Sequence, residues 1–276
     1  MNNGKVIISG EHSVVYGELA LAASVGLGVS AKVVENGGSE KNEIIERAIE
    51  VAGEKKDTQV LIESQIPIGS GMGSSAAVSA AVIRAVREGV SKPIISKEEL
   101  YDLVMECEKV AHGNPSGIDA ATVVYGGVIA FTKGKPIERL QIHNPINVIL
   151  INTGRPVEST KEMVELVSTN KNKDKVLSEI GVITKEIKRK LVEGEKADEL
   201  IDKNGLLLED LGVVGESARS LSAKLRGFGC SVKVSGAGGF KVGSGMLLVT
   251  APDLAKIASK LDDMQIDYIK TELGQI

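Results

Sequence analysis

Residues 67–77 read PIGSGMGSSAA, and this stretch decides how the rest of the sequence is interpreted. Three alternating glycines remove side chains from a tight loop, and Ser74 and Ser75 follow where a helical run of small and apolar residues begins. The start of a helix offers unpaired backbone N–H groups and a partial positive charge, which favour a bound phosphate. The same pattern also fits an ordinary glycine-rich turn in which Ser74 or Ser75 caps the helix.

Two familiar phosphate-binding motifs do not match this loop. No lysine follows its last glycine, so it is not a Walker A loop. Its GxGxG spacing, with no acidic residue ending a second strand, also departs from the dinucleotide-binding fingerprint of Rossmann folds. A nicotinamide oxidoreductase is therefore disfavoured.

Two carboxylates flank a compact turn further along, in EKVAHGNPSGIDAA at 108–121. Glu108 lies at the edge of the apolar stripe of a helix that begins at Ser96, and Asp119 takes the third position of a helix that we expect Ser116 to cap. Taken singly, Glu108 fits a surface acid and Asp119 a capping-box acid. As a pair beside one turn, they suit a metal ligand and a general base.

Two further segments carry candidate site residues. Lys5 lies on a predicted first strand and is followed by Glu11 and His12, while KVSGAGG at 233–239 forms a second glycine loop directly after a strand. Each also has a simpler interpretation. Lys5 fits a solvated lysine at a strand end, His12 a structural histidine, and the second loop a tight turn.

Composition limits the classes of protein to consider. The chain has 276 residues, 42% of them hydrophobic and 25% charged, as in ordinary globular proteins. Lys and Arg number 33 against 37 Asp and Glu, giving a net charge of -4 without a basic block, which disfavours a nucleic-acid-binding role. Cys107 and Cys230 lack metal-site spacing and fit reduced core thiols. With no signal peptide or membrane segment, we expect a cytoplasmic protein.

The order of predicted elements indicates the α+β class. Strands alternate with helices in the first half, and the second half is mainly helical before strands return, so we expect a boundary near 145–155. A break in the helical region is expected near Asn204 and Gly205. The predicted strands are 5–9, 29–34, 58–63, 124–132 and 146–152, with more near the end of the chain.

Together these segments resemble the GHMP kinases. The matching blocks, in order along the chain, are GKVIISGEHSVVYGELALA (4–22), IPIGSGMGSSAA (66–77), EKVAHGNPSGIDA (108–120), INTGRPVESTKEMV (151–164) and KVSGAGG (233–239). Within this family, GEHSVVYG is most similar to the mevalonate kinase branch.

The resemblance implies a GHMP kinase fold of two α+β domains with the active site in the cleft between them. Residues 1–148 would carry the phosphate loop and the catalytic aspartate, and 149–276 would form a ferredoxin-like domain. The implied activity is transfer of the γ-phosphate of ATP to mevalonate with Mg²⁺, in a cytoplasmic homodimer that binds neither nucleic acid nor membrane. Phosphomevalonate, a sugar, or a non-catalytic nucleotide-sensing role are the alternatives.

The resemblance also implies a role for each matching residue. Asp119 would be the base and Lys5 its partner, while Ser75 and Glu108 would hold Mg²⁺. The residues expected at the ATP phosphates are Gly69, Ser70, Gly71, Met72, Gly73 and Ser74. Those expected at the substrate are Glu11, His12, Thr160, Gly236 and Ala237.

Two segments depart from the family pattern. The block at 233–239 continues as GAGGFKVGSGM, so Phe240 and Lys241 replace part of a glycine run. A basic residue is usual two positions before Thr160, where this chain has Glu158. The cation that meets the substrate carboxylate is therefore left open between Arg155 and Lys161.

Overall fold

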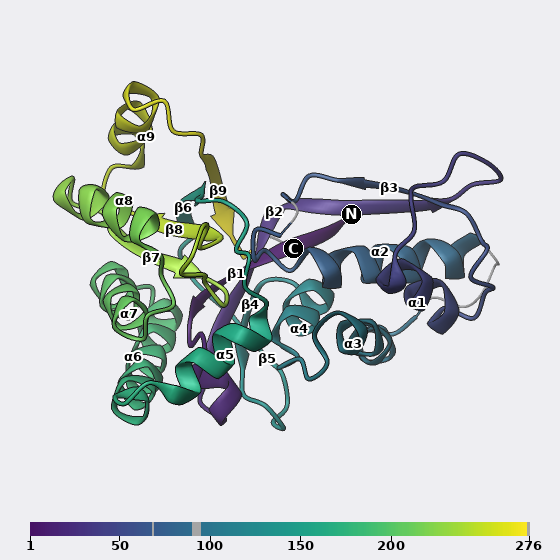
Figure 1. The fold of residues 1–276 in the computed structure, drawn as a ribbon, viewed down its shortest axis with the longest axis horizontal. Coiled ribbons are helices and arrows are strands. Elements are labelled where there is room, and N and C mark those ends of the chain that lie inside the picture. Colours follow the sequence, from purple (N-terminus) through teal and green to yellow (C-terminus); the bar gives the residue numbers. More distant parts are fainter. Residues whose placement is uncertain (68, 90–94, 275–276) are drawn as a thin grey trace.

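The computed structural model describes residues 1–67, 69–89 and 95–274, and these residues form an α+β fold with two lobes. Nine strands belong to one sheet, and every ladder between them is antiparallel among the described residues. Helices α1 to α3 lie at one end of the molecule and α6 to α9 at the other (Figure 1). The predicted α+β class is confirmed.

The first lobe is built around one long strand. β2 (Ala20–Val33) pairs with β1 (Asn2–Ser9), β3 (Val60–Ser64) and β4 (Val128–Phe131), and β5 (Glu138–Leu140) extends the sheet beyond β4. The helices of this lobe are α1 (Glu43–Val51), α2 (Ser74–Gly89), α3 (Lys97–His112) and α4 (Ile118–Tyr125), with a short 3₁₀ turn, η1 (Ser13–Tyr16), after β1. Small residues on the buried face of α2, including Ala76, Ala77 and Ala80, let this helix pack closely against the sheet.

The second lobe repeats the arrangement of helices beside a sheet. Its strands are β6 (Ile146–Asn152), β7 (Ser231–Ser235), β8 (Met246–Thr250) and β9 (Ile269–Leu273), in the order β9-β6-β8-β7. Its helices are α5 (Thr160–Thr169), α6 (Lys173–Glu193), α7 (Asp198–Asp210), α8 (Glu216–Gly227) and α9 (Leu254–Asp263). Leu273 of β9 also pairs with Val25 of β2, which joins the sheets of the two lobes.

Several sequence-based boundaries differ from the structure. β2 begins at Ala20, nine residues before the start of the strand predicted at 29–34. The strand predicted at 124–132 begins later, because α4 continues to Tyr125 and the glycines at 126 and 127 turn the chain before β4 starts at Val128. β6 begins at Ile146, so a division between 148 and 149 would fall inside a strand. The division into two domains at that point stays a prediction.

The helix break expected near Asn204 and Gly205 is wrong. Both residues lie inside α7, and the break between α7 and α8 comes instead at 211–215. Gly205 serves close packing, because a Cβ atom there would lie 2.1 Å from the carbonyl oxygen of Val232 in β7. A glycine inside a helical pattern can therefore mark a close approach of backbones rather than a break.

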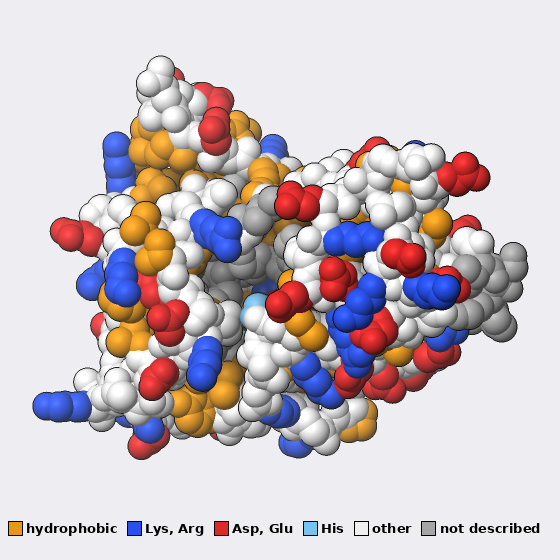
Figure 2. Space-filling model, turned by 45° about the vertical axis from the view of Figure 1, so that its right-hand side comes forward, with side chains coloured by type: hydrophobic (Ala, Val, Ile, Leu, Met, Phe, Trp, Pro, Cys, Tyr) orange, Lys and Arg blue, Asp and Glu red, His pale blue; other side chains and the backbone are white. Residues whose placement is uncertain are grey.

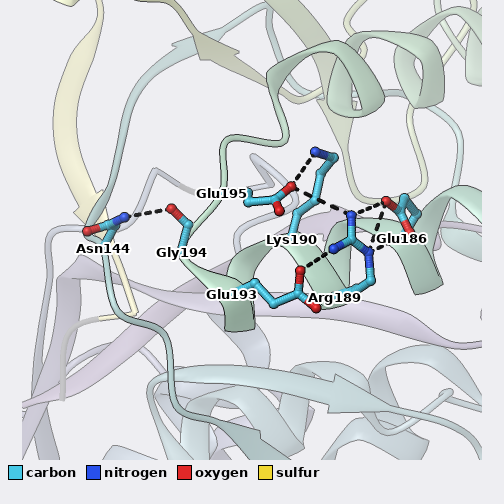
Figure 3. Close-up of polar contacts among 7 residues, drawn as sticks. All are labelled: Asn144, Glu186, Arg189, Lys190, Glu193, Gly194 and Glu195. Atoms are coloured by element: carbon cyan, nitrogen blue, oxygen red, sulfur yellow. Dashed lines mark hydrogen bonds and ion pairs between the residues drawn. The ribbon is translucent and has the colours of Figure 1, made fainter.

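Polar contacts surround the end of α6, and one hydrogen bond joins it to the segment before β6 (Figure 3). Arg189 pairs with Glu186 and Glu193, and Asn144 donates from Nδ2 to the Gly194 carbonyl at 2.8 Å. All of these ion pairs are solvent-exposed, and such pairs contribute little to stability.

Two smaller expectations concern the cysteines and the membrane. Cys107 and Cys230 are buried free thiols, as predicted. Among the described residues, none of the helices combines the length and apolar character needed to cross a bilayer.

Candidate active site

Lys5 of β1 is the residue around which the candidate site is assembled. Its side chain is almost fully buried, and its ammonium lies 3.0 Å from Asp119 Oδ1. The same ammonium donates to the Gly71 carbonyl at 3.0 Å, while the Lys5 backbone N–H donates to the Met72 carbonyl at 2.9 Å. Strand β1, the first glycine loop and helix α4 therefore meet at one ammonium group, which excludes the solvated strand-end interpretation.

Asp119 is the second residue of α4, not the third. Gly117 occupies the N-cap position in a left-handed conformation and provides no side-chain cap, so the prediction that Ser116 caps this helix is wrong. Ser116 Oγ still accepts a hydrogen bond from the Ile118 N–H, at 3.4 Å. The Asp119 side chain is 28% exposed, so its carboxylate faces Lys5 on one side and remains open to a ligand.

The first glycine loop has the backbone conformation that only glycine adopts readily. Gly69, Gly71 and Gly73 all have positive φ angles, and α2 begins at Ser74 as predicted. A Cβ atom on Gly73 would lie 2.9 Å from Lys5 Cγ, so the loop must pass bare beside this lysine. The geometry fits phosphate groups at the start of α2, and this role stays a prediction.

Glu108 of α3 is buried, so its interpretation as a surface acid is wrong. Desolvation, strengthened by the nearby Asp119 carboxylate, raises the pKa of Glu108 to about 7, although a hydrogen bond with Ser75 and the charge of Lys5 oppose this shift. Glu108 Oε2 lies 3.8 Å from His112 Nε2. Glu108 Oε1 has no hydrogen-bond partner in the described part of the chain.

The pair formed by Glu108 and Ser75 fits a magnesium ion chemically. A carboxylate and a hydroxyl are hard oxygen donors, and Mg²⁺ commonly binds to one or two carboxylates together with substrate phosphates. The unpartnered Oε1 of Glu108 is a buried acceptor that a cation would satisfy.

Glu11 is paired with a residue to which the sequence analysis gave no role. Lys233 of β7 makes an ion pair with Glu11, and both side chains are buried. Burial raises the pKa of Glu11 and lowers that of Lys233, while each charge opposes the shift of the other. The available signal was a lysine in the middle of the apolar strand CSVKVSG, where a buried cation needs a partner.

His12 is buried beside the second glycine loop. Its Nε2 lies 3.0 Å from the Ala237 carbonyl, and desolvation lowers the pKa of His12 to about 4, so the imidazole is neutral at pH 7. A neutral ring facing a carbonyl donates from Nε2, which leaves Nδ1 as an acceptor. A Cβ on Gly236 would lie 3.5 Å from the Gly71 carbonyl oxygen, so the two glycine loops are in contact.

Thr160 is less closely connected to these groups. It is the exposed first residue of α5, and no hydrogen bond joins it to the other candidate residues within the described ranges. Glu158 is buried and accepts a hydrogen bond from the Lys241 N–H at 3.0 Å. It therefore fixes the loop at 236–246, which departs from the family pattern. Arg155 crosses to the first lobe, where a Cβ on Gly69 would lie 2.7 Å from its Cδ.

The candidate residues line the junction of the two lobes, and Figure 2 shows a hollow between the lobes. On the first lobe lie Lys5, the first glycine loop, Glu108 and Asp119. The second lobe supplies Lys233 and Ala237, which contact Glu11 and His12. A carboxylate paired with a lysine beside a bare glycine loop can accept a proton from a hydroxyl while the loop holds an anion.

Comparison with known proteins gives consistent results. The family model "GHMP kinases N terminal domain" matches residues 42–127. Mevalonate kinase of Archaeoglobus fulgidus is 31% identical over 86% of this chain and 87% of its own length. The structure of Methanococcus jannaschii mevalonate kinase has a TM-score of 0.83 at 21% identity, covering 99% of this chain and 97% of its own. That of L. major mevalonate kinase with R-mevalonate also scores 0.83, at 18% identity, covering 99% and 94%.

Proposed function

The chain belongs to the mevalonate kinases of the GHMP kinase family, and we propose that it transfers the γ-phosphate of ATP to the primary hydroxyl of mevalonate. The family relationship and the fold support a kinase that acts on a hydroxyl group. The single observation that carries the mechanism is the contact between Lys5 and Asp119 beside the first glycine loop.

In this mechanism, Asp119 and Lys5 act on the oxygen that attacks phosphorus. Asp119 accepts the hydroxyl proton, the oxygen forms a bond to the γ-phosphorus, and the bond to the β–γ bridging oxygen breaks to release ADP. Lys5 keeps the carboxylate oriented and stabilises negative charge on the reacting oxygens. Because phosphoryl transfer depends mainly on positioning and charge neutralisation, these two side chains would supply both at the attacking oxygen.

The loop before α2 is the proposed site for the ATP phosphates. Backbone N–H groups at the start of the helix donate to phosphate oxygens, and bare glycines permit their close approach. Ser75 and Glu108 would hold Mg²⁺, which neutralises phosphate charge when bound. Glu108 would release its proton to do so, since burial raises its pKa to about 7.

The acceptor would lie across the lobe junction, near His12 and Ala237. A neutral His12 cannot neutralise a carboxylate, so the cation for the acid group of mevalonate comes from another residue. Arg155 is a better candidate than Lys161, because the aliphatic part of its side chain lies against Gly69 of the first glycine loop. We further infer a cytoplasmic homodimer that binds neither nucleic acid nor membrane, by analogy with the family.

A panel of acceptors tests this proposal. ADP release is measured with MgATP and R-mevalonate, phosphomevalonate, galactose or homoserine, under identical conditions. We expect kcat/KM to be highest for R-mevalonate by at least about 100-fold, since a site built for specific polar groups rejects analogues that lack them. A preference for phosphomevalonate or a sugar would replace the proposed acceptor, and absence of turnover with all of them would favour a nucleotide sensor.

A further inference from the structure

The buried pair of Lys233 and Glu11 is unexplained by the chemistry described so far. Lys233 extends from β7 in the second lobe, and besides Glu11 it donates to the carbonyls of Ile7 at 3.0 Å and Val234 at 2.8 Å. All three ammonium protons therefore have acceptors. A buried ion pair is weak evidence for a role in stability, because desolvation offsets much of the attraction. The pair invites a functional explanation.

Lys5 is within electrostatic reach of this pair. Burial raises the pKa of Glu11, while the ammonium of Lys233 lowers it strongly and that of Lys5 lowers it less. Lys5 and Ile7 lie two residues apart on β1, so they share one face of the strand. Lys5 is therefore in contact with Asp119, at 3.0 Å, and its charge also acts on Glu11 in the buried pair.

We propose that Lys233 is a positioning residue. It neutralises the charge of Glu11, so that Lys5 keeps its ion pair with Asp119 instead of pairing with Glu11. This inference rests on the proposed function of Asp119 and Lys5. Without Lys233, Glu11 would be a buried carboxylate lacking a counter-charge, a strongly unfavourable state. The flexible Lys5 side chain carries the other charge that acts on Glu11, and its movement toward Glu11 would weaken its ion pair with Asp119. The arrangement also makes the reactive pair depend on contact between the lobes.

Substitutions at both positions of the pair test the proposal. Lys233→Met is expected to lower kcat at least about 10-fold, because small displacements of a positioned group are costly for catalysis, with little change in KM for ATP. In a Glu11→Gln background no charged Glu11 competes for Lys5, so adding Lys233→Met is expected to change kcat by less than about 3-fold relative to Glu11→Gln alone. Glu11 is itself expected at the substrate, and because both of these proteins lack its carboxylate, the effect of that loss on turnover cancels in the comparison. Lys256→Met, which changes an exposed lysine of the same lobe, is the matched control.

A purely structural pair gives a different pattern. It predicts that Lys233→Met loses melting temperature while the folded enzyme keeps the parental kcat, and this outcome would overturn the proposal. A folded double variant with kcat at least about 10-fold below that of Glu11→Gln would also overturn it. If Lys233→Met does not fold, the double variant and Glu11→Gln still decide, since the proposal requires their kcat values to agree within about 3-fold.

One measurement is independent of the substrate. A crystal structure of Lys233→Met, or of Lys233→Ala if the first does not crystallise, is expected to show Lys5 Nζ displaced from Asp119 toward Glu11. An unchanged contact between Lys5 and Asp119 would contradict the proposal. Failure of the parent enzyme to phosphorylate mevalonate would refute only the proposed function, because this structural result requires no turnover.

Discussion

At the scale of single residues, the candidate site depends on ionisable groups that burial has shifted or paired. Glu108 is buried with a pKa raised to about 7, His12 is buried with a pKa lowered to about 4, and Lys5 is buried against Asp119. Strongly perturbed groups at a lobe junction are typical of functional sites. Each of these states is a consequence of tertiary packing.

Glu108 gives a prediction about pH. The folded protein holds this proton more tightly than the unfolded chain does, so protonation stabilises the fold. That stabilisation is complete below the ordinary pKa of 4.5 and is lost as the pH rises through about 7. Relative to Glu108→Gln, the parent is therefore expected to lose up to about 3 kcal/mol of unfolding free energy between these pH values without Mg²⁺.

Urea denaturation of both proteins across this pH range measures the difference. Glu106→Gln is the matched control, because Glu106 lies on the same helix but is exposed and paired with Lys109. Addition of Mg²⁺ and ATP should stabilise the parent more than Glu108→Gln above pH 7. Parallel pH profiles for the parent and Glu108→Gln would show that Glu108 is not a desolvated metal ligand.

The residue types of the site could be predicted from the sequence, but their surroundings could not. Lys5, Glu108 and Asp119 stood out because their motifs match a family, and the structure brings all three together. Lys233 went without a role because its partner, Glu11, is 222 positions away in sequence. Such pairing depends on how two lobes dock, which no local pattern records.

At the scale of elements, the first glycine loop is the feature most sensitive to substitution. Gly73→Ala adds a side chain that would lie 2.9 Å from Lys5 Cγ, at a backbone φ of 68°. We expect turnover to fall by up to about 100-fold, because Lys5 must move, and ATP affinity to weaken as well. Steady-state kinetics and ATP titration measure the two effects.

Gly134→Ala separates backbone strain from the contact with Lys5. Gly134 also has a positive φ, of 78°, but nothing lies within 4 Å of its Cβ position. Both variants therefore bear the cost of a left-handed alanine, about 1–2 kcal/mol. Equal turnover in the two variants would mean that the loop tolerates a side chain beside Lys5, against the proposed site.

Helix and strand types were largely predictable, whereas ends and breaks depended on packing. The start of α2 at Ser74 follows from the glycine loop, and Ser96, where a helix was expected to begin, caps α3 by accepting a hydrogen bond from the Glu99 N–H. The interruption expected at Gly205 was wrong because the missing side chain accommodates the backbone of β7. A glycine can be required because another part of the backbone comes too close for a side chain, or because its φ angle is positive. Only the fold distinguishes these two reasons.

At the scale of the whole molecule, β9 links the lobes through one residue of its strand. Leu273 is buried, pairs with Ile146 of β6 and also pairs with Val25 of β2. Leu273→Ala is expected to cost about 2–5 kcal/mol of unfolding free energy, the usual range for a truncated buried leucine. Denaturant titration gives this value.

Leu206→Ala is the control for that experiment, because Leu206 is 45% exposed on α7. A change within about 0.5 kcal/mol is expected there. If Leu273→Ala loses as little unfolding free energy as Leu206→Ala, then β9 does not hold the two lobes together.

The most direct measurement for the central claim is a single-turnover assay of the parent and Asp119→Asn on the same preparations used for melting temperatures. Formation of phosphomevalonate from MgATP and R-mevalonate is followed, and MgATP affinity is titrated separately. We predict that Asp119→Asn folds, binds MgATP like the parent and loses at least about 100-fold in the rate of phosphoryl transfer. A stable Asp119→Asn protein that transfers phosphate at nearly the parental rate would contradict the account.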